Sequence, residues 1–138
     1  MRWFALSLVA ACSTPPVPLP QQPTPYMGII SVGMLPARDA KRVEELYHEV
    51  GLCTERRDVP LSELRFFVVT SDTIPRWILN YPGPPTQGAS VGNMVFLSMR
   101  SWPCDSCVRH ELTHSATASE DTRLHPEKYF NAKCRNEW

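Results

Sequence analysis

The five residues His110-Glu111-Leu112-Thr113-His114 constrain the fold more than any other part of this 138-residue chain. Residues four apart lie on the same face of an α-helix, so a helix here would let the two histidines hold one metal ion together. The carboxylate of Glu111 directly follows the first histidine and could reach a water molecule bound to that ion. The pattern H-E-x-x-H therefore predicts a helix with a metal site on one face.

At these residues the chain resembles zinc-dependent peptidases of the zincin type, which carry H-E-x-x-H on the active-site helix. The resemblance implies Zn²⁺ as cofactor, His110 and His114 as ligands, Glu111 as general base and a peptide or protein as substrate. The longer metzincin pattern is not followed, because Thr117 stands in place of its glycine and Glu120 in place of its last histidine.

Catalytic zinc usually takes three protein ligands and leaves a fourth position for water. His125 is the favoured third ligand, because three of the four histidines of the chain fall between residues 110 and 125. The intervening residues 115–124 suffice to end the helix and turn back toward the metal, and Pro126 would fix the backbone after the ligand. Glu120 and Glu127 remain alternatives for this position.

Two short segments carry a second resemblance. Val108-Arg109-His110-Glu111 and His125-Pro126-Glu127-Lys128-Tyr129-Phe130, with Cys134 beyond, are similar to a group of small exported bacterial lipoproteins. These have a V-R-H-E-x-x-H helix, an H-P-x-x-x-F segment and a closing cysteine. The resemblance covers residues 46–134 loosely and only the two motifs closely. It implies a zinc metallopeptidase and indicates no substrate.

Three further side chains could assist such a site. Tyr129 or Arg123 could stabilise the oxyanion that forms when water adds to a peptide carbonyl, provided that it faces the metal. Asp121 could instead accept the second ring proton of a ligand histidine. A packing aromatic ring and solvated charges are the simpler interpretations of these residues.

The N-terminal region predicts export. Residues 1–11 combine Arg2 with an uncharged apolar run and read as a lipoprotein signal peptide, after which Cys12 would be lipidated. Residues 12–35 would form a tether, because the six prolines between residues 13 and 25 favour extended polyproline II. We therefore expect a membrane-anchored protein of the bacterial cell envelope. The formal net charge is 0 and no basic face is evident, so nucleic acid is not expected as a partner.

The remaining four cysteines fit an exported domain. Cys53, Cys104, Cys107 and Cys134 are expected to form two disulfides, and a zinc–thiolate site that uses the C-x-x-C at 104–107 is the alternative. Three pairings are possible, and we favour Cys53–Cys134 with Cys104–Cys107.

Residues 36–138 are expected to form one α+β domain, a minimal zincin-like unit with a small sheet, a backing helix and the motif helix. The hydrophobic pattern predicts a helix over 38–50 that ends at Gly51, strands over 64–70 and 91–99, and a loop over 75–88. The motif helix would be capped by Asp105 or Ser106 and end near Ala118. The second strand would border the cleft, and His48 would be a structural histidine.

Two functions follow from this pattern. The first is a lipid-anchored zinc metallopeptidase in which His110, His114 and His125 bind the metal and Glu111 is the base. The second is a zinc-binding structural lipoprotein of the envelope without catalysis. Glu111 distinguishes them, because a structural site has no need of a carboxylate beside its ligand.

Overall fold

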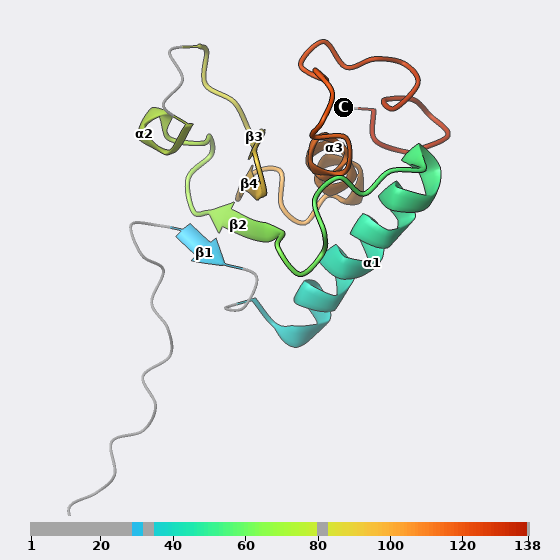
Figure 1. Ribbon diagram of the computed structural model, residues 1–138. Coiled ribbons are helices and arrows are strands. Elements are labelled where there is room, and N and C mark those ends of the chain that lie inside the picture. The colour runs from blue at the N-terminus through green and yellow to red at the C-terminus, as the bar shows by residue number, and fades with distance from the viewer. Residues whose placement is uncertain (1–28, 32–34, 80–82, 138) are drawn as a thin grey trace, which may run out of the picture.

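The computed structural model describes residues 29–31, 35–79 and 83–137. The expected signal peptide, Cys12 and most of the proposed tether lie outside the described residues. The elements in chain order are β1 (Ile29–Ser31), α1 (Ala37–Thr54), β2 (Arg65–Val69), α2 (Arg76–Leu79), β3 (Gly88–Val91), β4 (Met94–Ser98) and α3 (Asp105–Ala116). The described part of the chain is therefore mixed α+β, as predicted (Figure 1).

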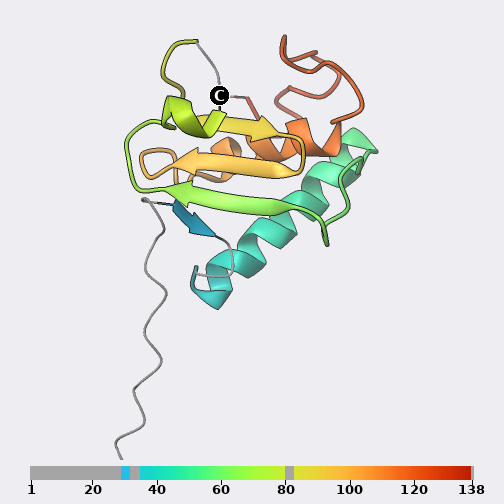
Figure 2. The same ribbon diagram turned by 60° about the vertical axis from the view of Figure 1, so that its left-hand side comes forward.

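The strands form one sheet in the order β1-β2-β4-β3. Strands β2 and β4 pair in parallel at its centre, while β1 and β3 run antiparallel to their neighbours at the two edges. Figure 2 shows the strands side by side, with α1 and α3 together on one face of the sheet. Helix α3 contacts α1 as well as strands β3 and β4.

The two central strands alternate their side chains between two apolar layers, as the pleat of a strand requires. Phe66, Val68, Val95 and Leu97 face the helices and pack with apolar residues of α1 and α3. On the opposite face, Phe67 of β2 stacks on its register partner Phe96 of β4, with 5.0 Å between ring centroids. The larger layer fixes α3, and with it the H-E-x-x-H segment, against the sheet.

The predicted strand over 91–99 is wrong in one respect, because this stretch contains the turn of a hairpin. Strand β3 ends at Val91, the chain reverses through Gly92 and Asn93, and β4 begins at Met94. Gly92 has φ +60°, a conformation that glycine adopts without steric cost. As a result, β3 is the edge strand nearest the cleft and β4 is internal.

Helix α1 is confirmed but is longer than the hydrophobic pattern indicated. Gly51 does not end it: the helix continues to Thr54, and Glu55 follows in the left-handed conformation. A Cβ atom at position 51 would lie 2.8 Å from Cγ of Arg57, so the glycine makes room for the Arg57 side chain.

The predicted loop over 75–88 contains the short helix α2, and Ile74 forms an isolated bridge with Thr86. The N-cap of α3 is Cys104 rather than Asp105 or Ser106, and its sulfur accepts a hydrogen bond from the Cys107 backbone N–H.

The favoured disulfide pairing is confirmed. Cys53 at the end of α1 is bonded to Cys134, with 5.6 Å between their Cα atoms, and Cys104 is bonded to Cys107, with 5.3 Å. The first bond joins residues 81 apart and holds the C-terminal segment, residues 131–137, beside α1.

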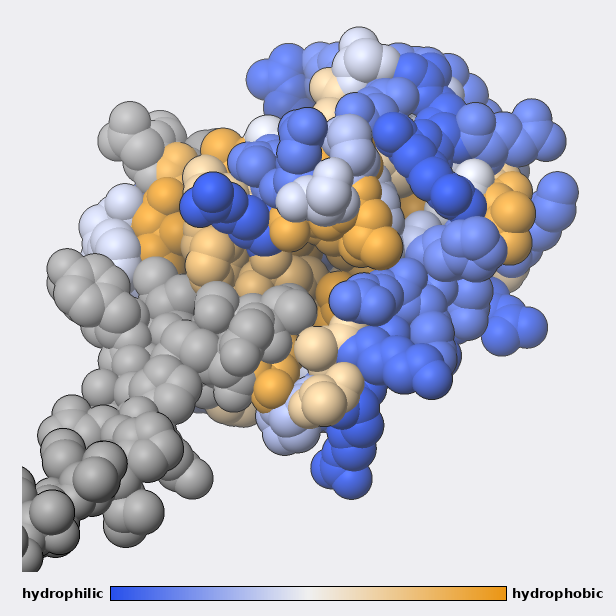
Figure 3. Space-filling view, turned by 60° about the horizontal axis from the view of Figure 1, so that its bottom comes forward, coloured by the Kyte–Doolittle hydropathy of each residue, from blue (hydrophilic) through white to orange (hydrophobic). Residues whose placement is uncertain are grey.

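Hydrophilic and apolar residues occupy separate regions of the described surface. On the face shown in Figure 3, hydrophilic residues cover the larger part and apolar residues gather in a group of their own. Among the described residues, no helix combines the length and the apolar character that crossing a membrane requires.

Leucine truncations at two positions test this packing. Leu112 in α3 is 0% exposed, whereas Leu124 is 92% exposed. We expect Leu112→Ala to lower the free energy of unfolding by about 2–5 kcal/mol, since it leaves a cavity in the main core. Leu124→Ala should change it by less than about 0.5 kcal/mol. Urea unfolding followed by circular dichroism measures both, and equal effects would contradict the position assigned to α3.

Candidate metal centre

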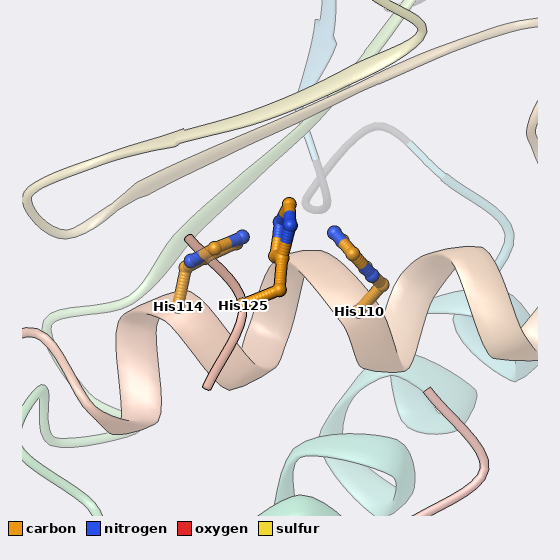
Figure 4. A group of neighbouring side chains, drawn as sticks. All are labelled: His110, His114 and His125. Atoms are coloured by element: carbon orange, nitrogen blue, oxygen red, sulfur yellow. The ribbon is translucent and has the colours of Figure 1, made fainter. Parts of the chain in front are cut away.

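Three histidines converge on one point. His110 and His114 project from the same face of α3, and His125 approaches from the segment that follows the helix (Figure 4). One ring nitrogen of each lies within 4.8 Å of those of the other two, so the group could hold a metal ion. The structure therefore brings together the three residues predicted as ligands.

His125 has a left-handed backbone conformation. Its φ is +50°, in the left-handed region that costs a residue with a side chain roughly 1–2 kcal/mol. A turn fixes this conformation, since the His125 backbone N–H donates to the Thr122 carbonyl at 2.9 Å. The loop thus accepts strain at the residue that completes the histidine group.

The C-terminal segment orients the imidazole of His110. Nδ1 of His110 lies 2.9 Å from the backbone carbonyl oxygen of Asn136. Because a carbonyl can only accept, this contact places the proton on Nδ1 and leaves the Nε2 lone pair for a metal. Sequence analysis did not identify Asn136, since nothing local relates residue 136 to residue 110.

Asn136 is held in turn by contacts on every side. It is 0% exposed. Its side-chain amide donates to Thr113 Oγ1 and to the Tyr129 carbonyl, and its side-chain oxygen accepts from the Asn131 N–H. A fully bonded buried amide has one orientation, so it fixes the carbonyl that faces His110.

The imidazole of His114 has a hydroxyl partner. Nδ1 of His114 lies 2.9 Å from Thr122 Oγ1, and Thr122 is buried. The role suggested for Asp121 therefore belongs to its neighbour. Asp121 is exposed and binds Arg123 through two side-chain hydrogen bonds of 2.7 and 2.9 Å.

Phe130 packs against all three imidazoles. Its ring centroid lies 5.0 Å from that of His110, 4.7 Å from that of His114 and 4.8 Å from that of His125. The ring is 8% exposed and provides an apolar support for the histidines. In the sequence, Phe130 was noticed only as part of the H-P-x-x-x-F segment, with no role assigned.

Glu111 is a buried carboxylate at the edge of this group. It is 3% exposed, and Ser90 of β3 donates to its backbone carbonyl at 2.7 Å and lies 3.3 Å from its carboxylate. Burial raises the pKa of Glu111 to about 8, while the Ser90 hydroxyl opposes the shift. A Cβ atom at Gly88 would lie 2.9 Å from Glu111 Cδ, so the glycine makes room for this side chain.

The two helix histidines favour the neutral form. Burial lowers the pKa of His114 to about 4, with further lowering from His110 and His125. The pKa of His110 is also lowered by burial, although its contact with Asn136 acts in the opposite direction. Neutral imidazole is the form that binds metals, so these surroundings favour ligand function.

The carboxylates that were alternatives for the third ligand have other contacts. Glu120 binds Arg56, Lys128 and the hydroxyl of Tyr129. Glu127 is exposed. Among the described residues, neither belongs to the group that could hold a metal.

The remaining candidates are divided between the cavity and the surface. The Tyr129 hydroxyl donates to Glu120 rather than facing the histidines. Arg123 lines the cavity at the site, with its side chain 87% exposed. His48 is exposed, and its Nδ1 lies 3.0 Å from the Arg57 guanidinium.

A cavity of about 960 Å³ opens at the histidine group. Strand β3 lines one side of it, and the segment containing Arg123 and His125 lines another. Glu111 lines the same cavity as the histidines, and Ser90 of β3 lies 3.3 Å from its carboxylate. The arrangement can thus bind a cation and place a buried carboxylate next to it.

Comparison with protein-family models, with curated proteins and with solved structures finds no match to this chain.

Substitution of His125 should separate metal binding from stability. His125→Asn removes an imidazole ligand but places a residue that tolerates the left-handed conformation. We expect zinc affinity to fall at least 100-fold, while the chelator-treated protein is as stable as the parent or slightly more stable. Chelator competition and thermal unfolding measure the two quantities. Unchanged zinc affinity would contradict the ligand role of His125.

The pH dependence of stability tests the burial of Glu111. With its pKa raised to about 8 from 4.5, the folded chain keeps a proton between pH 6.5 and 8 that the unfolded chain has lost. Stability with a chelator present should therefore fall as the pH rises, by roughly 1–2 kcal/mol across this window. His114, whose pKa is lowered to about 4 from 6.5, and His110, whose pKa is also lowered, act in the opposite direction as the pH rises through 6.5.

Urea unfolding at pH 6.5 and pH 8 measures this loss, and Glu111→Gln is the comparison. The glutamine does not titrate, so the variant should lose less stability than the parent over the same interval. Equal losses in the two proteins would contradict the raised pKa of Glu111.

Proposed function

We propose that this chain is a zinc-dependent metallopeptidase with a minimal zincin-like fold, tethered to the bacterial cell envelope through Cys12. One observation carries the proposal: the buried Glu111 carboxylate lines the same cavity as three convergent imidazoles. Burying a carboxylate is costly unless a cation or hydrogen-bond donors compensate. A divalent cation held by the histidines would provide that compensation and favour the ionised form of Glu111.

The histidine group fits zinc. Three neutral imidazoles are a ligand set that zinc takes in catalytic sites, and two of the rings have partners for their second nitrogen. When bound, zinc would supply Lewis acidity that makes water a nucleophile near neutral pH. The residues that would hold it are His110, His114 and His125.

The chain's own residues account for the proton transfers. The Glu111 carboxylate takes a proton from the attacking water and later passes it to the nitrogen of the leaving amine. Ser90 steadies that carboxylate, and the neighbouring Gly88 leaves room for it. Strand β3 forms the wall of the cavity next to Glu111, where an extended peptide could lie.

A structural zinc site in an envelope lipoprotein is the second candidate. Such sites usually close with four protein ligands. Among the described residues, the group that could hold a metal consists of three histidines, and a cavity opens on it. These two observations favour catalysis.

Glu111→Gln tests the function. We expect the full chain to bind one zinc ion and to hydrolyse members of a fluorogenic peptide library. The variant should keep its zinc and lose hydrolysis by roughly 100- to 10,000-fold, because the transferable proton site is removed. Zinc content by mass spectrometry and initial rates measure the two effects.

Glu63→Gln is the matched control, because Glu63 is exposed. It should retain both zinc and activity. Stoichiometric zinc with equal peptide hydrolysis in the parent and Glu111→Gln would reject catalysis by Glu111 and favour the structural role.

A further inference from the structure

Two cysteines lie at the N-terminal end of α3, the helix that carries His110 and His114. Cys104 is the N-cap of α3 and Cys107 lies in its first turn, three residues before His110. The two form a disulfide. Cys104 is exposed, whereas Cys107 is 7% exposed. An external thiol would therefore meet the sulfur of Cys104 first.

The surroundings of Cys104 favour its thiolate. The backbone N–H of Cys107 donates to the Cys104 sulfur at 3.3 Å, and the Ser106 hydroxyl lies 3.2 Å from the same atom. The free N–H groups and the positive end of the α3 dipole lie at this position. A C-x-x-C motif at a helix N-terminus is the setting in which cysteine pKa values fall below their ordinary value.

One neighbouring charge acts against this effect and is compensated. Asp105 follows Cys104, and its negative charge would disfavour a thiolate. Arg42 of α1 binds the Asp105 carboxylate through hydrogen bonds of 2.5 and 3.4 Å and holds the pKa of Asp105 below its ordinary value. The guanidinium thus offsets the carboxylate next to the sulfur.

The two disulfides differ in what they constrain. Cys53–Cys134 closes a separation of 81 residues, so breaking it would release a long loop. Cys104–Cys107 closes a separation of 3 residues within one turn. The entropy that a crosslink removes from the unfolded chain grows with loop length. The short crosslink therefore contributes less to the free energy of unfolding.

We propose that Cys104–Cys107 is a thiol–disulfide exchange site that accepts electrons from a peptide or protein dithiol. A thiolate of the dithiol attacks the Cys104 sulfur, the Cys104–Cys107 bond breaks, and Cys107 leaves as a thiolate that takes up a proton. The second thiolate of the dithiol then attacks its own sulfur in the mixed disulfide. Cys104 leaves as the thiolate that the helix N-terminus stabilises.

The exchange balances without a further reactant. The partner dithiol loses two electrons and two protons and becomes a disulfide, while Cys104 and Cys107 become two thiols. The site is independent of hydrolysis at Glu111, since none of its groups belongs to the histidine site.

Titration of the full chain with glutathione buffers tests the proposal. Samples equilibrated at increasing ratios of reduced to oxidised glutathione are quenched, alkylated and mapped by mass spectrometry. Cys104–Cys107 should reach half-reduction at an at least 100-fold lower ratio than Cys53–Cys134, with the circular dichroism spectrum unchanged. Reduction of both pairs together, or of Cys53–Cys134 first, would overturn the proposal.

Single-cysteine chemistry provides the second measurement. In Cys107→Ser, the pH dependence of Cys104 alkylation by iodoacetamide should give a pKa at least one unit below the ordinary value of about 8.5. Ser106→Ala in that background should raise this pKa, and the exposed Ser71→Ala should leave it unchanged. A Cys104 pKa at or above the ordinary value would overturn the assignment.

Discussion

Helix α3 buries apolar side chains on one face and carries the polar groups of the site on another. The rest of the structure must therefore provide both an apolar core and hydrogen-bond partners for this one helix. Val108 and Leu112 pack against α1 and the sheet. His110 and Glu111 are almost as deeply buried, and buried polar groups are costly without partners. Those partners come from outside the helix: Ser90 on the edge strand contacts Glu111, and the backbone of the C-terminal segment contacts His110. Thr122 in the loop does the same for His114.

The C-terminal segment and the loop after α3 are bonded to α1 and to the residues that follow it. The Cys53–Cys134 bond holds the C-terminal segment beside the end of α1. Further along, Asp58 accepts hydrogen bonds from the backbone and hydroxyl of Ser119, and Arg56 binds Glu120. The loop that contains His125 therefore starts from a fixed point. This anchoring is what allows a strained residue to complete the histidine group.

The two proposed chemistries use opposite properties of one helix. Its N-terminus offers free N–H groups and a positive dipole, which suit a thiolate at Cys104. Its second half offers a face with residues four apart, which suits two imidazoles on one metal. The groups do not overlap, so each can be altered without removing the other.

The sequence by itself determined the elements that depend on local spacing: α1, β2, the motif helix, and His110 and His114 on one face of it. It also favoured His125 as the residue that joins them and the pairing Cys53–Cys134 with Cys104–Cys107, while Glu120, Glu127 and two other pairings stayed open. Only the tertiary structure decided the hairpin before α3, the burial of Glu111 and the choice of Thr122 and Asn136 as partners. These depend on contacts between residues far apart in the chain, whose geometry is set by how the helices pack on the sheet rather than by any local pattern.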